Sequence, residues 1–338
     1  MQANDLLGHL LRDVSRSFYL TLRVLPRPVR PQIGLAYLLA RTSDTIADTQ
    51  IVSASQRVDA LQLFRRAVIE NNPIPLSFLE EFRGQSTPAE KTLLERAAES
   101  IAILQTFSKP DKERIQKLLD IIIGGQASDL QRFSGGDGNR IESLVTEAEL
   151  EDYTYRVAGC VGEFWTQMCW AHVFSPKAEE APALMEDAVR FGKGLQLINI
   201  LRDIPRDLRN RRCYLPITTL RTVHLQPGDL LDASRIDQLR PVYRRYLDQT
   251  RDHLHAGWRY TNAIPYRQVR IRLACAWPIL IGERTLRQLE RGNPLDDRTP
   301  IKIQRGEVRA ILLRSIALYP WPRLWQRQFM PRSDQECS

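Results

Sequence analysis

The sequence has no apolar run long enough to cross a bilayer. A membrane-spanning helix needs about 20 mostly apolar residues, and every apolar stretch of this 338-residue chain is shorter. The first residues also lack the apolar segment of a secretory signal peptide. We therefore expect a cytoplasmic protein without a transmembrane segment, and peripheral contact with a membrane surface is the alternative.

Cysteine and histidine are scarce, with five residues of each. The cysteines are odd in number and have no C-x-x-C spacing, so reduced thiols are expected. His253 and His255 stand at i and i+2, which would not put them on one helix face, and no zinc site is predicted. A G-x-G-x-x-G fingerprint is missing as well, which excludes a Rossmann nucleotide site.

Alternating apolar and polar runs, the pattern of β-strands, are also missing. Apolar residues instead recur every three or four positions, as in Ile115, Leu118, Leu119 and Ile122, which is typical of a buried helix face. Helices are predicted over 3–24, from the break at 25–28 to about 48, and over 55–70, 89–107, 110–133, 147 onward, 235–262 and 266–290. The hydrophobic fraction of 43% is sufficient for a core. We predict an all-α protein with almost no sheet.

Two groups of small residues interrupt these helices. Gly124 and Gly125 cost roughly 1 kcal/mol each relative to alanine inside a helix, so they are expected to serve close packing or a bend. Ala158, Gly159 and Gly162 leave room for close approach to the backbone, most simply by a neighbouring helix.

The formal net charge of +8 favours anionic partners, such as diphosphates or acidic lipids. Nucleic acid is disfavoured because the basic residues are dispersed and no zinc-finger or RNP signature is present. Residues 319–329 mix tryptophan and tyrosine with arginine. They are predicted either to pack on the body of the protein or to contact a membrane interface.

The most distinctive polar pattern lies in residues 192–207. Asp203 and Asp207 are four positions apart, so a helix would place both carboxylates on one face. Gln196, Asn199 and Arg202 lie just before them on the same helix. Carboxylates at this spacing repel each other unless a cation lies nearby.

A second acidic pair, Asp44 and Asp48, follows Arg41 on another apolar helix. Any one D-x-x-x-D in a chain with 40 acidic residues is most simply a solvated helix face. Two pairs, each on an apolar helix with an arginine nearby, instead suggest carboxylates facing each other across a cavity. Magnesium suits such a site because it binds few carboxylates and contacts substrate phosphates directly, and manganese is the alternative.

Five motifs, in order over about residues 12–315, resemble the head-to-head prenyl synthases, the family of squalene synthase and phytoene or dehydrosqualene synthase. They are Ser15–Phe18, similar to the family's SRSF opening; Arg41–Asp48, similar to its first aspartate motif; Gly125–Leu130, similar to its Gx3-4DL element; Tyr153–Gly162, similar to YCxxVAGxVG; and Gln196–Asp207 with Tyr214–Pro216, similar to its second aspartate motif and YLP sequel.

The resemblance implies a single-domain helical bundle around a central cavity, spanning 1–318 with an aromatic and basic tail at 319–338. It implies that two farnesyl diphosphates bind there with magnesium. The metal ligands would be Asp44, Asp48, Asp203 and Asp207, which would be catalytic together with Tyr153. Substrate would be bound by Ser15, Arg16, Ser17, Phe18, Arg41, Gln126, Gln196, Asn199 and Arg202. Tyr153 would assist proton removal, and Tyr155 is a competing candidate.

The family divides over the fate of a cyclopropyl intermediate, which is either reduced with NADPH to squalene or loses a proton. Lys302–Gly306 resembles the KIRKG stretch of squalene synthases, and Arg272–Leu286 resembles their RxxCAxPxxxxxxTL helix. Squalene synthase is therefore predicted, with NADPH bound at Lys302 and Arg305. A phytoene or dehydrosqualene synthase without a reductant is the alternative, and a non-catalytic lipid-binding protein is the third hypothesis.

Three positions depart from the family pattern. Ala47 and Arg206 replace the usual acidic residues of the two aspartate motifs, and Ile279 stands where squalene synthases often carry glutamine. Pro205 lies inside the second acidic pair, where it removes a helix hydrogen bond and is expected to kink the helix.

Overall fold

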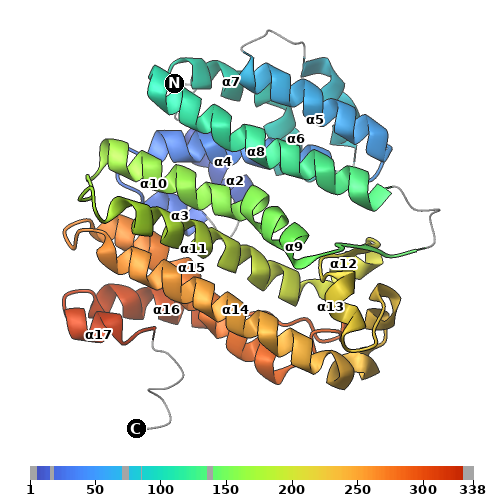
Figure 1. The fold of residues 1–338 in the computed structure, drawn as a ribbon. Helices are drawn as coiled ribbons and strands as arrows, with labels where there is room; N and C mark the ends of the chain where they lie inside the picture. Colours follow the sequence, from blue (N-terminus) through green and yellow to red (C-terminus); the bar gives the residue numbers. More distant parts are fainter. Residues whose placement is uncertain (1–5, 16–18, 71–75, 85, 135–139, 330–338) are drawn as a thin grey trace. The chain divides into compact units, whose positions relative to one another are not determined.

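The computed structural model describes residues 6–15, 19–70, 76–84, 86–134 and 140–329. These residues form two compact units (Figure 1). The first unit contains 1–136 and 163–176, and the second contains 137–162 and 177–338. The predicted division into a domain of 1–318 and a tail stays a prediction.

The first unit is built on α4 (Arg30–Asp48), which packs against α5, α7 and α8. Its buried face carries apolar side chains from Ile33 to Ile46, at helical spacing. The other elements of this unit are η1 (Leu6–Leu10), α2 (Leu11–Ser15), α3 (Tyr19–Val24), α5 (Ala54–Ile69), η3 (Leu76–Arg83), α6 (Pro88–Glu95), α7 (Ala97–Gln105), α8 (Lys109–Ser134) and most of α10 (Cys160–His172).

Two helices of the first unit begin at capping boxes. At the start of α5, the Ser53 hydroxyl accepts a hydrogen bond from the Gln56 backbone N–H. In return, the Ser53 backbone N–H donates to the Gln56 side chain. Thr87 and Glu90 make the same exchange at the start of α6. Each box satisfies N–H groups that a helix leaves without partners in its first turn.

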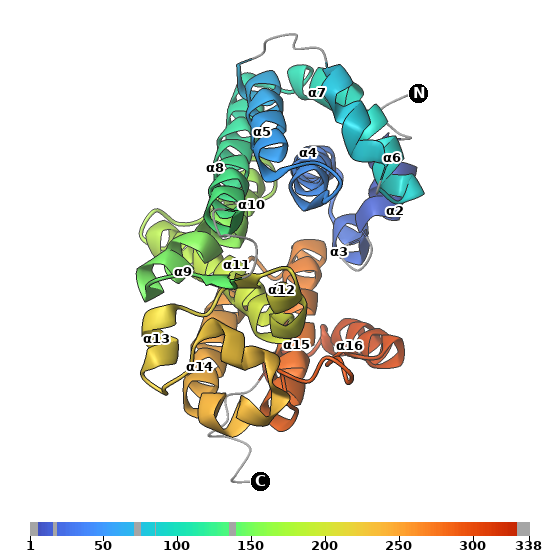
Figure 2. The ribbon, with the colours of Figure 1, turned by 90° about the vertical axis from the view of Figure 1, so that its right-hand side faces the viewer.

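The second unit is organised by α11 (Ala181–Arg202), α14 (Ile236–Ala263) and α15 (Val269–Arg291), which run side by side (Figures 1 and 2). Its other elements are β1 (Glu142–Ser143), α9 (Glu147–Thr154), η4 (Tyr155–Gly159), α12 (Ile204–Arg209), β2 (Arg212–Cys213), α13 (Ile217–Arg221), η5 (Pro227–Leu231), η6 (Ala233–Arg235), α16 (Arg305–Leu318) and α17 (Pro322–Gln326).

Small residues set the contact between α11 and the segment from η4 to α10. A Cβ atom added at Gly162 would lie 2.0 Å from the carbonyl oxygen of Ala188, and one added at Gly192 would lie 2.2 Å from that of Ala158. The predicted role of the small residues after Tyr155 in helix packing is thereby confirmed. The packing role predicted for Gly124 is wrong, because a Cβ there would meet nothing within 4 Å and α8 continues through it.

The helical prediction is confirmed with local differences. The expectation of almost no sheet is confirmed, since the described residues form one pair of two-residue strands, β1 and β2, which pair in parallel. The stretch between the predicted helices 55–70 and 89–107 contains η3, and the predicted helix 89–107 breaks at Arg96. The four cysteines that the structure describes are buried and free, as expected. Within the described ranges no helix has both the length and the apolarity to cross a membrane.

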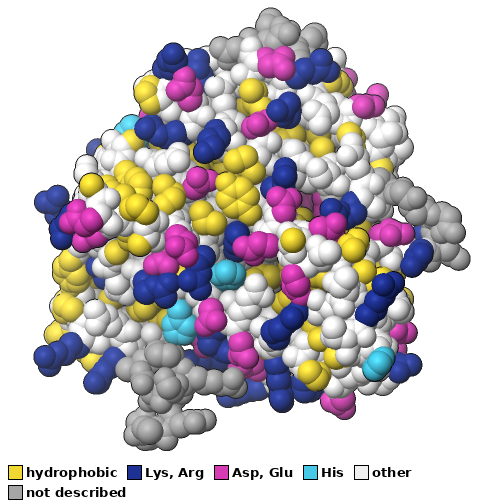
Figure 3. All heavy atoms as spheres, in the orientation of Figure 1, with side chains coloured by type: hydrophobic (Ala, Val, Ile, Leu, Met, Phe, Trp, Pro, Cys, Tyr) yellow, Lys and Arg dark blue, Asp and Glu magenta, His cyan; other side chains and the backbone are white. Residues whose placement is uncertain are grey.

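Charged side chains are mixed on the face in Figure 3, where Lys and Arg alternate with Asp and Glu. Ion pairs at the surface of the described chain include Arg156 with Asp152 at 2.7 Å and Arg259 with Asp187 at 2.6 Å. Exposed pairs of this kind contribute little to stability. Figure 3 shows the basic residues dispersed over this face.

Candidate active site

The first acidic pair lies at the C-terminal end of α4. The helix buries Ile46 and Ala47 and leaves Asp44 and Asp48 accessible, with 52% of the Asp44 side chain exposed. The neighbouring Thr45 hydroxyl donates to the carbonyl one turn back. The carboxylates are therefore the groups that α4 offers here to a ligand.

Asp44 is held by two side chains of the first unit. Gln126 on α8 donates its Nε2 to Asp44 Oδ1 at 2.6 Å, and Arg41 Nη1 lies 3.6 Å from Asp44 Oδ2. Arg41 Nη2 donates to Glu90 Oε1 at 2.6 Å, so this guanidinium bridges two carboxylates. Gln126, predicted to bind substrate, orients Asp44 in this structure.

The pKa of Asp44 is raised from 3.8 to about 6. Loss of hydration is the largest cause and the nearby Asp48 carboxylate the second, and both outweigh the opposing effects of Arg41 and Gln126. About half of the Asp44 side chain is exposed, so the carboxylate is accessible to water although Asp48, Arg41 and Gln126 lie close to it. A cation beside the pair would relieve the repulsion between the two carboxylates.

The second acidic pair lies where α11 ends and α12 begins. Asp203 separates the two helices with φ of −98° and ψ of 12°, two residues before Pro205. The expected interruption at Pro205 is confirmed, although the Asp207 N–H still donates to the Asp203 carbonyl at 2.9 Å. Arg202 donates twice to Asp203, at 2.8 and 2.7 Å. Asp203 is thus paired with the guanidinium that precedes it.

Pro205 leaves the carbonyl of Leu201 without its helical donor, because proline has no N–H. Tyr243 on α14 supplies the missing bond: its hydroxyl donates to the Leu201 oxygen at 3.1 Å. Tyr243 is only 2% exposed, and burial raises its pKa. The sequence analysis missed this residue, although a proline inside a buried helix signals that some other group must satisfy the fourth carbonyl before it.

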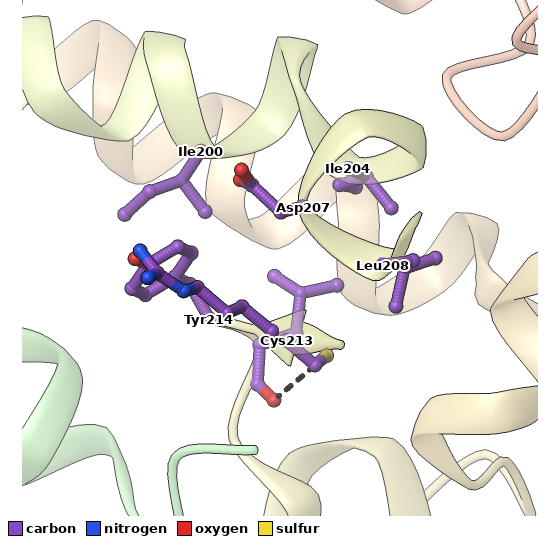
Figure 4. Close-up of a pocket in the computed structure, with 8 residues that line it drawn as sticks. Ile200, Ile204, Asp207, Leu208, Cys213 and Tyr214 are labelled. Carbon is purple, nitrogen blue, oxygen red and sulfur yellow. Dashed lines mark hydrogen bonds between the residues drawn. The ribbon is translucent and has the colours of Figure 1, made fainter. Parts of the chain in front are cut away.

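A small cavity of about 10 Å³ lies beside Asp207, and Figure 4 shows the Asp207 carboxylate directed toward Ile200. The other lining residues are Ile204, Leu208, Arg212, Cys213, Tyr214 and Leu215. Cys213 donates its thiol to the Leu215 carbonyl at 3.5 Å, and burial raises its pKa to about 12. The thiol is therefore neutral and unsuited to act as a nucleophile.

Tyr214 connects this cavity with the candidate catalytic tyrosine. The rings of Tyr153 and Tyr214 stack with centroids 4.5 Å apart. Tyr155 is directed differently, since its ring lies 5.7 Å from Lys193 Nζ, and Lys193 is paired with Glu151. The stack on a residue that also lines the Asp207 cavity supports Tyr153 over Tyr155.

The remaining predicted residues have simpler surroundings. Gln196 accepts a hydrogen bond from Asn199 at 3.5 Å on α11. Ser15 is buried, and its hydroxyl donates to the Leu11 carbonyl within its own helix. Lys302 and Arg305 are exposed at the start of α16. Arg16, Ser17 and Phe18 lie outside the described residues.

Both acidic pairs fit magnesium better than a protein-only metal centre. Among the residues that the structure describes, no three His, Cys, Asp or Glu side chains gather around a point that could hold a metal. Each pair offers two carboxylates, and Mg²⁺ is commonly held by one or two carboxylates together with water and substrate phosphate. An all-oxygen donor set suits Mg²⁺ or Mn²⁺ and not structural zinc.

The sequence is similar to proteins of one family. A family model described as squalene/phytoene synthase matches residues 11–307. The bifunctional lycopene cyclase/phytoene synthase of Blakeslea trispora is 30% identical over 235 residues, which cover 65% of this chain and 34% of that protein. The 15-cis-phytoene synthase of Synechocystis sp. is 27% identical over 268 residues, covering 78% and 70%. The chain spans 34% to 47% of the length of the bifunctional relatives that it matches.

Solved structures share the fold at low sequence identity. TcSQS in complex with a ligand has a TM-score of 0.76 at 19% identity, covering 98% of this chain and 93% of that one. Squalene synthase HpnC from Alicyclobacillus acidocaldarius has a TM-score of 0.61 at 19% identity, covering 86% and 94%. A dehydrosqualene synthase in complex with a ligand has a TM-score of 0.66 at 18% identity, covering 94% and 98%. These likenesses confirm the predicted all-α fold.

Proposed function

Because the chain belongs to the squalene/phytoene synthase family, we propose that it joins two molecules of farnesyl diphosphate head to head. The observation that carries the proposal is the two pairs of carboxylates, Asp44 with Asp48 at the end of α4 and Asp203 with Asp207 where α11 ends and α12 begins, each beside a guanidinium. This arrangement suits a substrate that brings its own phosphates and divalent cations.

The carboxylates of both pairs would hold Mg²⁺, or Mn²⁺, which would neutralise charge on the diphosphate leaving group. Arg202 is paired with Asp203 in the free protein. A cation that binds Asp203 would free this guanidinium to contact a diphosphate, for which its planar array of donors is well suited. Arg41 is anchored on one side by Glu90 and can make the same exchange at Asp44.

The reaction begins when one allylic diphosphate ionises. The double bond of the second farnesyl chain then attacks the cation, and loss of a proton closes a cyclopropylcarbinyl diphosphate. Tyr153, stacked on Tyr214, is the side chain that we assign to assist this proton removal. Tyrosine can act in this way because its hydroxyl both accepts and donates a proton.

We propose further that the intermediate is reduced with NADPH to squalene. The proposal rests on the resemblance of Lys302–Gly306 and Arg272–Leu286 to squalene synthase motifs, and Lys302 and Arg305 are exposed as a dinucleotide site requires. The alternative, a phytoene or dehydrosqualene synthase, is favoured by the printed names of the curated relatives, which are phytoene synthases. The cytoplasmic location of the protein stays a prediction.

The test is to incubate the purified protein with farnesyl diphosphate and Mg²⁺, with and without NADPH, and to analyse extracted lipids by mass spectrometry. Squalene formed only with NADPH would support the reductive proposal. Dehydrosqualene formed equally with and without NADPH would support the alternative, a phytoene or dehydrosqualene synthase. Phytoene formed from geranylgeranyl diphosphate in a parallel reaction would support it as well. Lipid bound without any product would contradict both and support a lipid-binding protein.

Tyr243 should matter to this site only while residue 205 is proline. Tyr243→Phe leaves the buried Leu201 carbonyl without a donor, whereas Pro205→Ala restores a backbone N–H that can reach it. Loss of a group that orients a metal ligand typically weakens metal affinity by about 10-fold to 100-fold. We expect Tyr243→Phe to weaken Mn²⁺ binding, measured by electron paramagnetic resonance, by about 10-fold. In a Pro205→Ala background it should have little effect, and equal effects in both backgrounds would contradict this role.

A further inference from the structure

Exposed apolar side chains are concentrated near the end of the described chain. Four large apolar residues within a span of twelve positions are strongly exposed: Leu313 at 69%, Ile316 at 49%, Trp321 at 57% and Leu324 at 43%. Single exposed apolar residues are normal on a protein surface, but a group of them marks an interaction site. These four residues, with Arg309, Arg314, Arg323 and Arg327, are here named the C-terminal surface.

Buried aromatic residues hold the C-terminal surface in its orientation. Trp325 is 1% exposed, stacks on Trp258 with ring centroids 5.4 Å apart, and donates its Nε1 to Asn262 Oδ1 at 2.9 Å. Tyr319, which lies between α16 and α17, stacks on Tyr266. Because these rings are fixed on α14 and on the connection that follows it, the outward direction of Trp321 and Leu324 is a property of the fold.

The adjoining helix α16 is fixed in the same way. Its Ser315 is fully buried and accepts a hydrogen bond from Trp277 Nε1 of α15 at 2.9 Å. Arg309, Leu313 and Ile316 stand at i, i+4 and i+7, which is one stripe of a helix, and all three are exposed. The stripe therefore combines apolar and cationic side chains on the face away from α15.

The charge of this segment has one sign. Residues 308–329 contain four arginines and no acidic residue. In the described part of the chain none of Arg309, Arg314, Arg323 and Arg327 forms an ion pair. The segment therefore keeps four cations available beside its apolar side chains.

We propose that the C-terminal surface binds an anionic lipid membrane. Leu313, Ile316, Trp321 and Leu324 insert at the boundary between headgroups and acyl chains, where tryptophan is favoured. The arginines contact lipid phosphates, and each basic residue near an anionic leaflet adds to the attraction. Charge complementarity selects this partner, because the arginines lie among the apolar residues and residues 308–329 contain no acidic side chain. The inference concerns binding alone and does not depend on the proposed reaction.

The test is co-sedimentation of the full chain with vesicles, without substrate. Vesicles of phosphatidylcholine with phosphatidylglycerol should bind the protein, and vesicles of phosphatidylcholine alone should bind it at least 10-fold more weakly at low salt. Trp321→Ser and Leu324→Ser should each weaken binding several-fold. The double variant Arg314→Gln/Arg323→Gln should weaken it about 10-fold, and its residual binding should respond less to added salt.

Matched variants keep the test decisive. Ile51→Ser removes a side chain that is 55% exposed in the first unit, and Lys109→Gln/Arg221→Gln removes two exposed cations elsewhere. Neither should change vesicle binding, and circular dichroism confirms that each variant is folded. Vesicle binding that does not depend on phosphatidylglycerol would overturn the proposal. A loss of binding in the control variants equal to that in the C-terminal variants would overturn it as well. A third contradicting result would be a dimer in light scattering that Trp321→Ser dissociates, together with no vesicle binding. The partner of the C-terminal surface would then be a second copy of the chain.

Discussion

Asp44→Asn is expected to lower the turnover of farnesyl diphosphate by at least about 100-fold, measured at saturating substrate and Mg²⁺. A carboxylate that holds a divalent cation contributes several kcal/mol to stabilising charge on the leaving group, and each 1.36 kcal/mol is a factor of ten in rate. The amide keeps the size of the side chain and its place beside Gln126, but it has no charge to offer the metal. Near-normal turnover would contradict the metal assignment.

The same variant should be more stable than the natural protein at neutral pH in the presence of a chelator. The pKa of Asp44 is about 6 when folded and near 3.8 otherwise, so the ionised carboxylate disfavours folding above pH 6. Asparagine removes that penalty. The gain in melting temperature should shrink as the pH falls from 6 to 3.8, below which the carboxyl is protonated in both states.

Asp59→Asn is the matched control, since Asp59 is exposed on α5 of the same unit. It should change neither turnover nor the pH dependence of the melting temperature. A loss of turnover in Asp44→Asn together with a higher melting temperature separates a role in the reaction from a loss of structure. Lower stability of Asp44→Asn at neutral pH would contradict the raised pKa.

Gly162→Ala and Gly192→Ala are each expected to destabilise the protein by about 3 kcal/mol. The added Cβ would lie 2.0 Å from a backbone oxygen in the first variant and 2.2 Å in the second. Backbone atoms in packed helices cannot turn aside as a flexible side chain can, so α11 must separate from the segment that carries Tyr153. Urea unfolding, followed by circular dichroism, measures the loss.

Gly124→Ala provides the contrasting result. It also replaces a glycine inside a helix, but its Cβ would meet nothing within 4 Å. Alanine is favoured there by about 0.5–1 kcal/mol, because glycine loses more backbone freedom on folding. The variant should therefore unfold at a higher urea concentration. If all three variants shifted the transition alike, the close approach of α11 at Gly162 and Gly192 would not be what limits stability.

Residues close in sequence made much of the site predictable. The spacing of three and four identified the helices, and the same periodicity placed Asp44 with Asp48, and Asp203 with Asp207, within one helical turn. Pro205 predicted an interruption of the helix, because the effect of a proline depends only on its own ring and its missing N–H. These properties are local, and the chain within a few residues is sufficient to specify them.

Tertiary structure decided the partners of those residues. Gln126 reaches Asp44 across 82 positions, and Tyr243 reaches the Leu201 carbonyl across 42. No local pattern shows which distant side chain will fill a vacant hydrogen-bonding position. Trp321 and Trp325 are four residues apart, yet one is 57% exposed and the other 1%. The difference arises because only Trp325 meets Trp258 and Asn262, so the fold of the second unit determined which aromatic faces solvent, while the sequence by itself determined the helices and the two acidic pairs.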